Sequence, residues 1–131
     1  MNIITYIISL VVLAVLDSVW LFTMGAKYKE WLGHLFSPTV NFVPAVIFYF
    51  IYVFGLVYFV IAPGLKQGSS MWWILASGAL FGLVAYATYD LTNHATMRDW
   101  PLVVTLLDIA WGTILTGISS VIIVFIVNYF K

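Results

Sequence analysis

Four long apolar runs divide this chain, and they constrain its fold more than any other feature. They cover about residues 3–24, 43–62, 71–92 and 102–129 of a chain of 131 residues. A helix needs about 20 consecutive apolar residues to cross the hydrocarbon core of a bilayer, and each run reaches that length. The sequence therefore predicts an all-α membrane protein whose four transmembrane helices form one bundle.

The composition supports a single integral membrane domain over residues 1–131. Hydrophobic residues make up 64% of the chain and charged residues 8%, against about 45 to 50% and about 25% in soluble proteins. The formal net charge is zero, and there is no cluster of Lys and Arg and no cysteine. These features favour the lipid bilayer as partner, give no support to nucleic-acid binding, and exclude disulfides.

Four crossings place both termini on one side of the membrane and the connections at residues 27–41 and 96–100 on the other. Residues 28–36 resemble a short amphipathic helix that could lie along the membrane interface. The connections hold Lys27, Lys29 and Arg98, against Lys66 and Lys131 at the opposite end. The positive-inside rule therefore favours a cytoplasmic position for the side that carries these connections.

Three aspartates lie within or at the end of the apolar runs. Asp17 comes late in the first run, Asp90 at the end of the third, and Asp108 early in the fourth. With the topology above, all three approach the same side of the membrane. A charge at the bilayer centre costs about 2.5 to 3.5 kcal/mol on insertion scales, so an intramembrane carboxylate indicates a functional site. The sequence predicts one shared polar pocket.

Two of these aspartates belong to similar short motifs. Leu16-Asp17-Ser18-Val19-Trp20 resembles Leu107-Asp108-Ile109-Ala110-Trp111, and in each the Asp and Trp fall on one face of a helix. Because the two helices run in opposite directions, the match resembles the internal symmetry of inverted-repeat transporters. Chance or a shared packing requirement explains so short a match about as well.

Small residues recur at four-residue spacing in the third and fourth runs. Gly78 and Gly82 share one helix face, and Thr116 and Ser120 share another. Small side chains let membrane helices approach closely. We therefore expect these four residues to pack helices together rather than to contact a ligand.

The densest polar stretch, residues 89–101, carries the remaining candidates. A continued helix would align Asp90, His94 and Arg98 at successive i+4 steps. A solvated ladder of ion pairs is one interpretation, but it needs neither Asn93 nor the nearby tyrosine, which favours a functional cluster. The predicted binding residues are Asp17, Asp90, Asn93, His94 and Asp108, supported by Trp20, Tyr89, Arg98 and Trp111.

Three chemistries fit this set, and the sequence does not identify a cofactor. Carboxylates with a histidine can relay protons, because histidine titrates near neutral pH. A metal site, if there is one, would use Asp17, Asp90, His94 and Asp108, although no metal-binding motif such as HExxH is present. Finally, Asp90, Asn93 and His94 could act on a lipid as acid, orienting group and base, but no GxSxG motif accompanies them.

The chain resembles a known family over essentially its whole length. The run Tyr89-Asp90-Leu91-Thr92-Asn93-His94-Ala95-Thr96, then Trp100-Pro101, then Leu107-Asp108-Ile109-Ala110-Trp111-Gly112 is similar to a family of bacterial predicted membrane proteins, domain of unknown function 2177. The resemblance implies four helices, a polar signature and a bacterial inner-membrane location. It implies no particular activity.

These observations favour a small transporter coupled to protons, or one that carries a cation or polar solute, with the aspartates as its site. A membrane-embedded enzyme acting on lipids is an alternative, so enzymatic activity stays open. A second alternative is a non-catalytic assembly subunit in which the carboxylates only pair across helices. Because four helices enclose little volume, we also expect a homo-oligomer.

Overall fold

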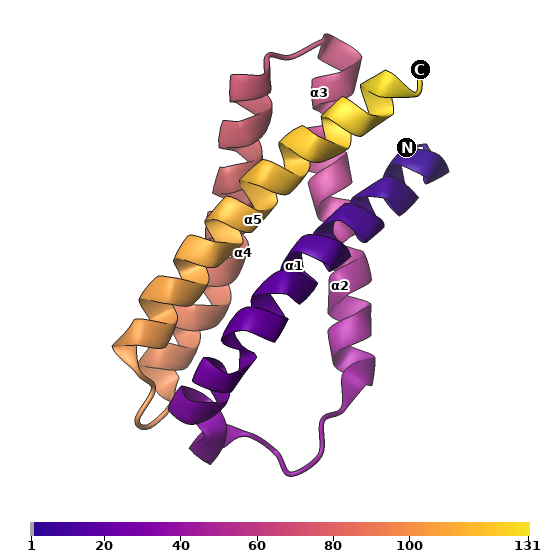
Figure 1. Cartoon of the computed structure of the whole chain (residues 1–131). Coiled ribbons are helices and arrows are strands. Elements are labelled where there is room, and N and C mark those ends of the chain that lie inside the picture. Colours follow the sequence, from indigo (N-terminus) through magenta and orange to yellow (C-terminus); the bar gives the residue numbers. More distant parts are fainter. Residues whose placement is uncertain (1) are drawn as a thin grey trace.

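The computed structural model describes residues 2–131, and all regular structure in that range is helical. The chain forms four long helical rods, the second of which is continuous through three segments. Figure 1 shows the two termini at one end of the bundle. The elements are α1 (Ile3–Leu32), η1 (Gly33–Leu35), α2 (Phe42–Leu56), η2 (Val57–Ile61), α3 (Ala62–Gln67), α4 (Met71–Thr96) and α5 (Leu102–Tyr129).

The predicted fold class is confirmed. Four helical stretches are long and apolar enough to cross a membrane: Ile3–Leu35, Phe42–Gln67, Met71–Thr96 and Leu102–Tyr129. The first three extend beyond the ends expected from hydrophobicity, which were residues 24, 62 and 92.

The first helix continues past residue 24 because its last turns have their own buried contacts. Leu32 is only 6% exposed and packs against Trp100 and Val104 of the α4–α5 connection and α5. Lys27 and Glu30 lie on the solvent side of the same turns, where their charged atoms are 3.7 Å apart. α1 therefore stays helical to Leu32, because one of its faces remains apolar and buried. The charges of residues 27–30 had suggested a loop there.

The second rod passes Pro63, where the sequence predicted a stop. A proline inside a helix lacks an N–H group and crowds the preceding turn. Here the wider π-helical turn η2 ends at Ile61, two residues before the proline, and such turns accommodate an interruption in the hydrogen-bond ladder. The rod ends instead at Gly68, whose φ of 61° is a left-handed conformation that glycine adopts without strain.

Helices α4 and α5 pack against each other through backbone-to-backbone approach. A Cβ atom on Gly82 would overlap the carbonyl oxygen of Gly112, and one on Gly78 would overlap Oγ of Ser120. Thr116 and Ser120 are fully buried at this contact. The expectation that these small residues face another helix is therefore confirmed.

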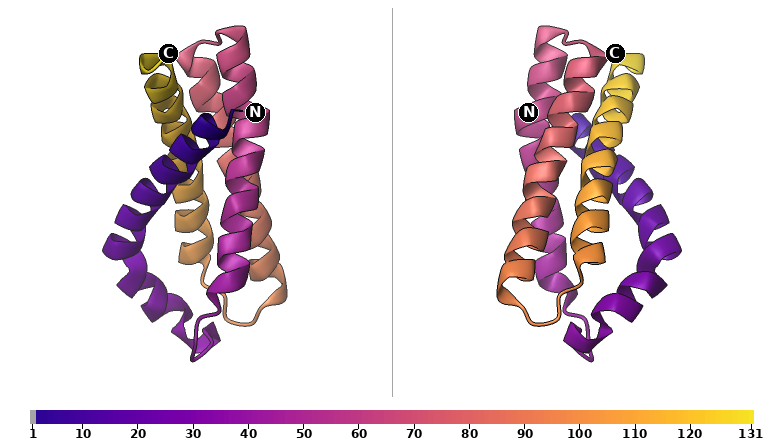
Figure 2. Two further views of the ribbon diagram at one scale, coloured as in Figure 1. Left: turned by 90° about the vertical axis from the view of Figure 1, so that its right-hand side faces the viewer. Right: turned by 90° about the vertical axis from the view of Figure 1, so that its left-hand side faces the viewer.

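The apolar core occupies the half of the bundle that contains the termini. Its fully buried members include Leu13, Val53, Leu56, Ile74 and Ile123, so all four rods contribute. The first half of α1 contributes Leu13 to this core. Figure 2 shows that α1 is bent: it diverges from the other rods between its N-terminal end and its middle, and its second half returns towards the loops. The hydroxyls of Ser18 and Thr23 donate to carbonyls four residues earlier, a contact that often bends helices.

Candidate functional site

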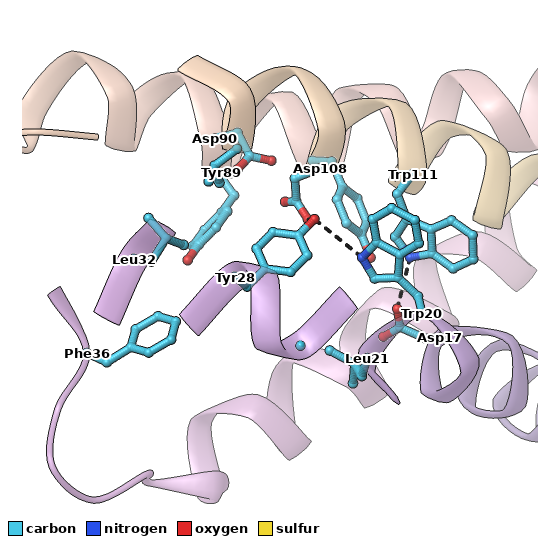
Figure 3. A pocket seen from close by; sticks show the side chains of 13 residues that line it. Asp17, Trp20, Leu21, Tyr28, Leu32, Phe36, Tyr89, Asp90, Asp108 and Trp111 are labelled. Carbon is cyan, nitrogen blue, oxygen red and sulfur yellow. Dashed lines mark hydrogen bonds between the residues drawn. The ribbon is translucent and has the colours of Figure 1, made fainter. Parts of the chain in front are cut away.

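A cavity of about 390 Å³ lies between the second half of α1 and the α4–α5 pair. We call it the acidic pocket, because all three intramembrane aspartates line it (Figure 3). Its walls are Asp17, Trp20, Leu21, Gly25, Tyr28, Leu32 and Phe36 from α1 and the chain after it, Tyr86, Tyr89 and Asp90 from α4, and Val104, Asp108 and Trp111 from α5. The structure thus brings together the carboxylates that the topology predicted to share one pocket.

The two Asp-x-x-Trp motifs meet in this pocket and are bonded crosswise. Nε1 of Trp111 on α5 donates to the Asp17 carboxylate on α1 at 3.1 Å. In the other direction, the Tyr28 hydroxyl on α1 donates to Asp108 on α5 at 3.0 Å, and Nε1 of Trp20 donates to Tyr28 at 3.3 Å. Each motif therefore supplies one carboxylate that accepts from the opposite helix.

The indole rings of the same motifs stack. Trp20 and Trp111 have ring centroids 4.5 Å apart and planes within 5° of parallel. Figure 3 shows this stack between the two aspartates that the motifs contribute. The two helices run in opposite directions (Figure 1), but the bonds are not equivalent, because Trp111 reaches Asp17 directly whereas Trp20 reaches Asp108 only through Tyr28.

Asp90 differs from the other two aspartates, because it is fully buried and neither carboxylate oxygen has a hydrogen-bond donor within residues 2–131, although Asp108 lies within hydrogen-bonding reach if either carboxyl carries a proton. Its side chain points towards Asp108 across the pocket wall (Figure 3). An ionised carboxylate out of water costs several kcal/mol unless it is paired. This group therefore needs a proton or a cationic ligand.

His94 lies one turn beyond Asp90 but does not line the acidic pocket. Its Nδ1 is 3.1 Å from Oγ1 of Thr105, which also accepts a hydrogen bond from Nε1 of Trp100 at 3.0 Å. Trp100 and Thr105 are buried. This network fastens the end of α4 to the start of α5, so the imidazole is engaged in holding the connection.

Two other predicted residues also lie outside the pocket. Asn93 does not line it, and Arg98 is exposed in the turn after α4 ends at Thr96. The expected i+4 ladder does not continue to Arg98, because the helix stops first. Between residues 2 and 131 the single ion pair is that of Lys27 with Glu30.

The described part of the chain holds no group of three or more His, Asp or Glu side chains arranged to bind a metal ion. The geometry gives the reason. His94 is turned to Thr105, and Asp17 is held by Trp111. The four residues named for a metal site therefore do not converge on one point.

Two polar pocket residues, Tyr28 and Tyr86, were not among the site candidates predicted from the sequence. Tyr28 was assigned to an interfacial segment, but α1 continues as a helix and carries its hydroxyl to Asp108. The spacing could have found it, because Asp17, Leu21, Gly25, Tyr28 and Leu32 follow one helical stripe. Tyr86 lies between the pocket and the core.

Comparisons with known proteins identify the family without an activity. A comparison with curated proteins finds no match, and neither does one with solved structures. The family profile described as "Predicted membrane protein (DUF2177)" matches residues 2–125. The match covers nearly the whole chain, including both Asp-x-x-Trp motifs and the polar end of α4. The chain, a membrane protein with four apolar helices, therefore belongs to the DUF2177 family of predicted membrane proteins.

Proposed function

We propose that this protein is a small carrier in which the acidic pocket exchanges protons for a cationic or polar solute. The observation that carries the proposal is Asp90, a fully buried carboxyl without a hydrogen-bond donor in the described chain that faces a second carboxyl, Asp108. Two such groups side by side cannot both stay ionised without compensation. A proton and a cation are interchangeable ways to provide that compensation, which is the chemistry of coupled exchange.

Buried hydroxyls in the core beside the pocket support the proposal. Oη of Tyr52 and Oγ1 of Thr116 are 2.5 Å apart, and the Tyr52 ring centroid is 6.4 Å from that of Tyr86, which lines the pocket. Ser119 and Ser120 follow one turn further along α5, and the Ser119 hydroxyl has no partner within the described chain. Hydroxyl groups can pass protons and can bind water when a pathway opens.

The alternatives explain less of this geometry. An enzyme that used Asp90 and His94 together would need both at one cavity, whereas His94 contacts Thr105. An assembly subunit would use carboxylates to join helices, and the bonds of Asp17 and Asp108 fit that role. It accounts less well for Asp90, because two adjacent carboxyls can bond to each other only when one of them holds a proton.

The proposal includes the location of the site. Lys27, Lys29 and Arg98 lie at the end of the bundle that holds the pocket. Their positive charge favours a cytoplasmic position for the mouth of the pocket, and we propose that the membrane is a bacterial inner membrane. We include a homo-oligomer, because four helices in one copy enclose little volume.

The test is exchange in proteoliposomes that contain a pH-sensitive dye. Sodium, potassium, choline and spermidine are added outside one at a time. We expect at least one to change the internal pH in a protein-dependent way, and we expect Asp108→Asn to abolish that change. Asp99→Asn, the same substitution in an exposed turn, should retain it. The proposal fails if no solute gives a protein-dependent change, or if Asp108→Asn behaves as the wild type.

A further inference from the structure

The walls of the acidic pocket combine negative charge with aromatic faces. Among its lining residues in the described chain there is no Lys, Arg or His. The aromatic side chains are Trp20, Tyr28, Phe36, Tyr86, Tyr89 and Trp111. The ring faces of Trp and Tyr attract cations, and the attraction grows when the cation has lost its water.

We propose that the acidic pocket binds an alkyl-substituted ammonium ion. This inference rests on the proposed function and deepens it, because it names the solute class. A small metal ion would require several converging oxygen ligands, and the aspartates do not supply them. An ammonium carrying alkyl groups sheds water at low cost, and its substituents fit against rings while its charge faces Asp90 and Asp108.

A second cavity adjoins the pocket and suits an alkyl arm. This side groove, of about 640 Å³, lies between α2 and α4 and is lined by Pro44, Ala45, Phe48, Ala85, Thr88 and Thr92. It shares Tyr86, Tyr89 and Asp108 with the acidic pocket. An ammonium held at Asp108 could therefore extend one apolar substituent between α2 and α4.

The experiment is calorimetric titration of the full chain in lipid nanodiscs, with empty nanodiscs subtracted. The probes are hexyltrimethylammonium and hexyldimethylamine oxide, which have nearly the same shape but differ in net charge. We expect the cation to bind about tenfold more tightly than the neutral probe. Equal affinities, or no protein-dependent binding of the cation, would overturn the inference.

Two variants test the aromatic contribution separately from folding. Trp20→Leu should weaken binding of the cation by about three- to tenfold and leave the neutral probe unchanged. Trp20 also bonds to Tyr28, so Tyr89→Leu provides a second test at a side chain that is already 58% exposed. Unchanged cation affinity in both variants would remove the aromatic basis of the site.

The side groove is tested by filling it. Ala45→Trp should weaken the binding of hexyltrimethylammonium and leave the affinity for tetramethylammonium unchanged, because only hexyltrimethylammonium has a long alkyl arm. Val46→Trp is the matched control, since Val46 is its neighbour on α2, is 51% exposed and lines neither cavity. If both tryptophan variants bind both cations as the wild type does, the arm does not lie in the groove.

The binding and exchange experiments distinguish failure of this inference from failure of the proposed function. Cation binding without any pH change in proteoliposomes would support this inference and contradict the proposed carrier. A pH change driven by sodium or potassium, without binding of hexyltrimethylammonium, would support the carrier and overturn the inference.

Discussion

At the scale of single residues, the three intramembrane aspartates differ in how far the protein satisfies them. Asp17 accepts from Trp111 and Asp108 accepts from Tyr28, and both side chains are partly exposed. Asp90 has neither a hydrogen-bond donor nor exposure within the described chain, and it faces only the carboxyl of Asp108. The sequence could identify all three, because each interrupts an apolar run, but it could not rank them. Their ranking depends on which donors reach them from another helix.

We expect Asp90→Asn to stabilise the fold and to abolish exchange. The amide keeps the shape and removes the possibility of a buried, unpaired charge, which should raise the free energy of unfolding by about 0.5 to 2 kcal/mol. Thermal unfolding in detergent at neutral pH measures this.

The matched control for that substitution is Asp99→Asn. Asp99 lies in the exposed turn after α4 at a φ of 56°, a conformation that asparagine tolerates well. Its unfolding midpoint should match that of the wild type. A lower midpoint for Asp90→Asn would mean that Asp90 contributes to the fold through an interaction other than those described.

At the scale of helices, the pattern of apolar residues predicts the number and order of the elements but not their ends. The charges of Lys27, Lys29 and Glu30 suggested a loop, whereas burial of Leu32 against Trp100 keeps the helix going. Such contacts join residues far apart in sequence, so local composition cannot reveal them. For the site, the topology predicts that the three aspartates approach one side of the membrane. It does not predict which other side chains line the pocket with them.

We expect Gly82→Ala to destabilise the α4–α5 pair. Its Cβ would overlap the backbone oxygen of Gly112, so a backbone must shift. Overpacking of this kind costs about 1 to 3 kcal/mol. The same thermal unfolding measurement detects it.

Gly25→Ala is the control for the glycine substitution, because nothing lies within 4 Å of the added Cβ. In the helix interior of α1 it should be neutral or stabilising by up to about 1 kcal/mol. Equal midpoints for the two alanine variants would show that α4 and α5 do not need this close approach.

At the scale of the whole molecule, the apolar core and the acidic pocket lie towards opposite ends of the bundle. The termini end holds the apolar core, and the end with the α1–α2 and α4–α5 connections holds the acidic pocket. Figure 1 places the N and C termini and the α3–α4 turn together, away from the α1–α2 connection. The fold therefore predicts two membrane faces with different segments exposed.

This arrangement is testable with single cysteines, because the chain has none of its own. Lys131→Cys and Ser69→Cys should react alike with a membrane-impermeant maleimide in sealed vesicles. Ser37→Cys, at an exposed position of the α1–α2 connection, should show the opposite behaviour. If the two cysteines at the termini end react in sealed vesicles, Ser37→Cys should react only after permeabilisation, and the reverse holds for the other orientation. Identical labelling of all three positions would contradict a bundle with its termini on one side of the membrane.

The stacked indoles of Trp20 and Trp111 have a further consequence. Two parallel chromophores 4.5 Å apart couple electronically, and here one belongs to α1 and the other to α5. Their near-ultraviolet circular dichroism and their emission therefore depend on the separation of the two helices. The Trp20–Trp111 pair is therefore an intrinsic spectroscopic probe of the distance between α1 and α5. Any separation of these two helices changes the circular dichroism and the emission of the pair.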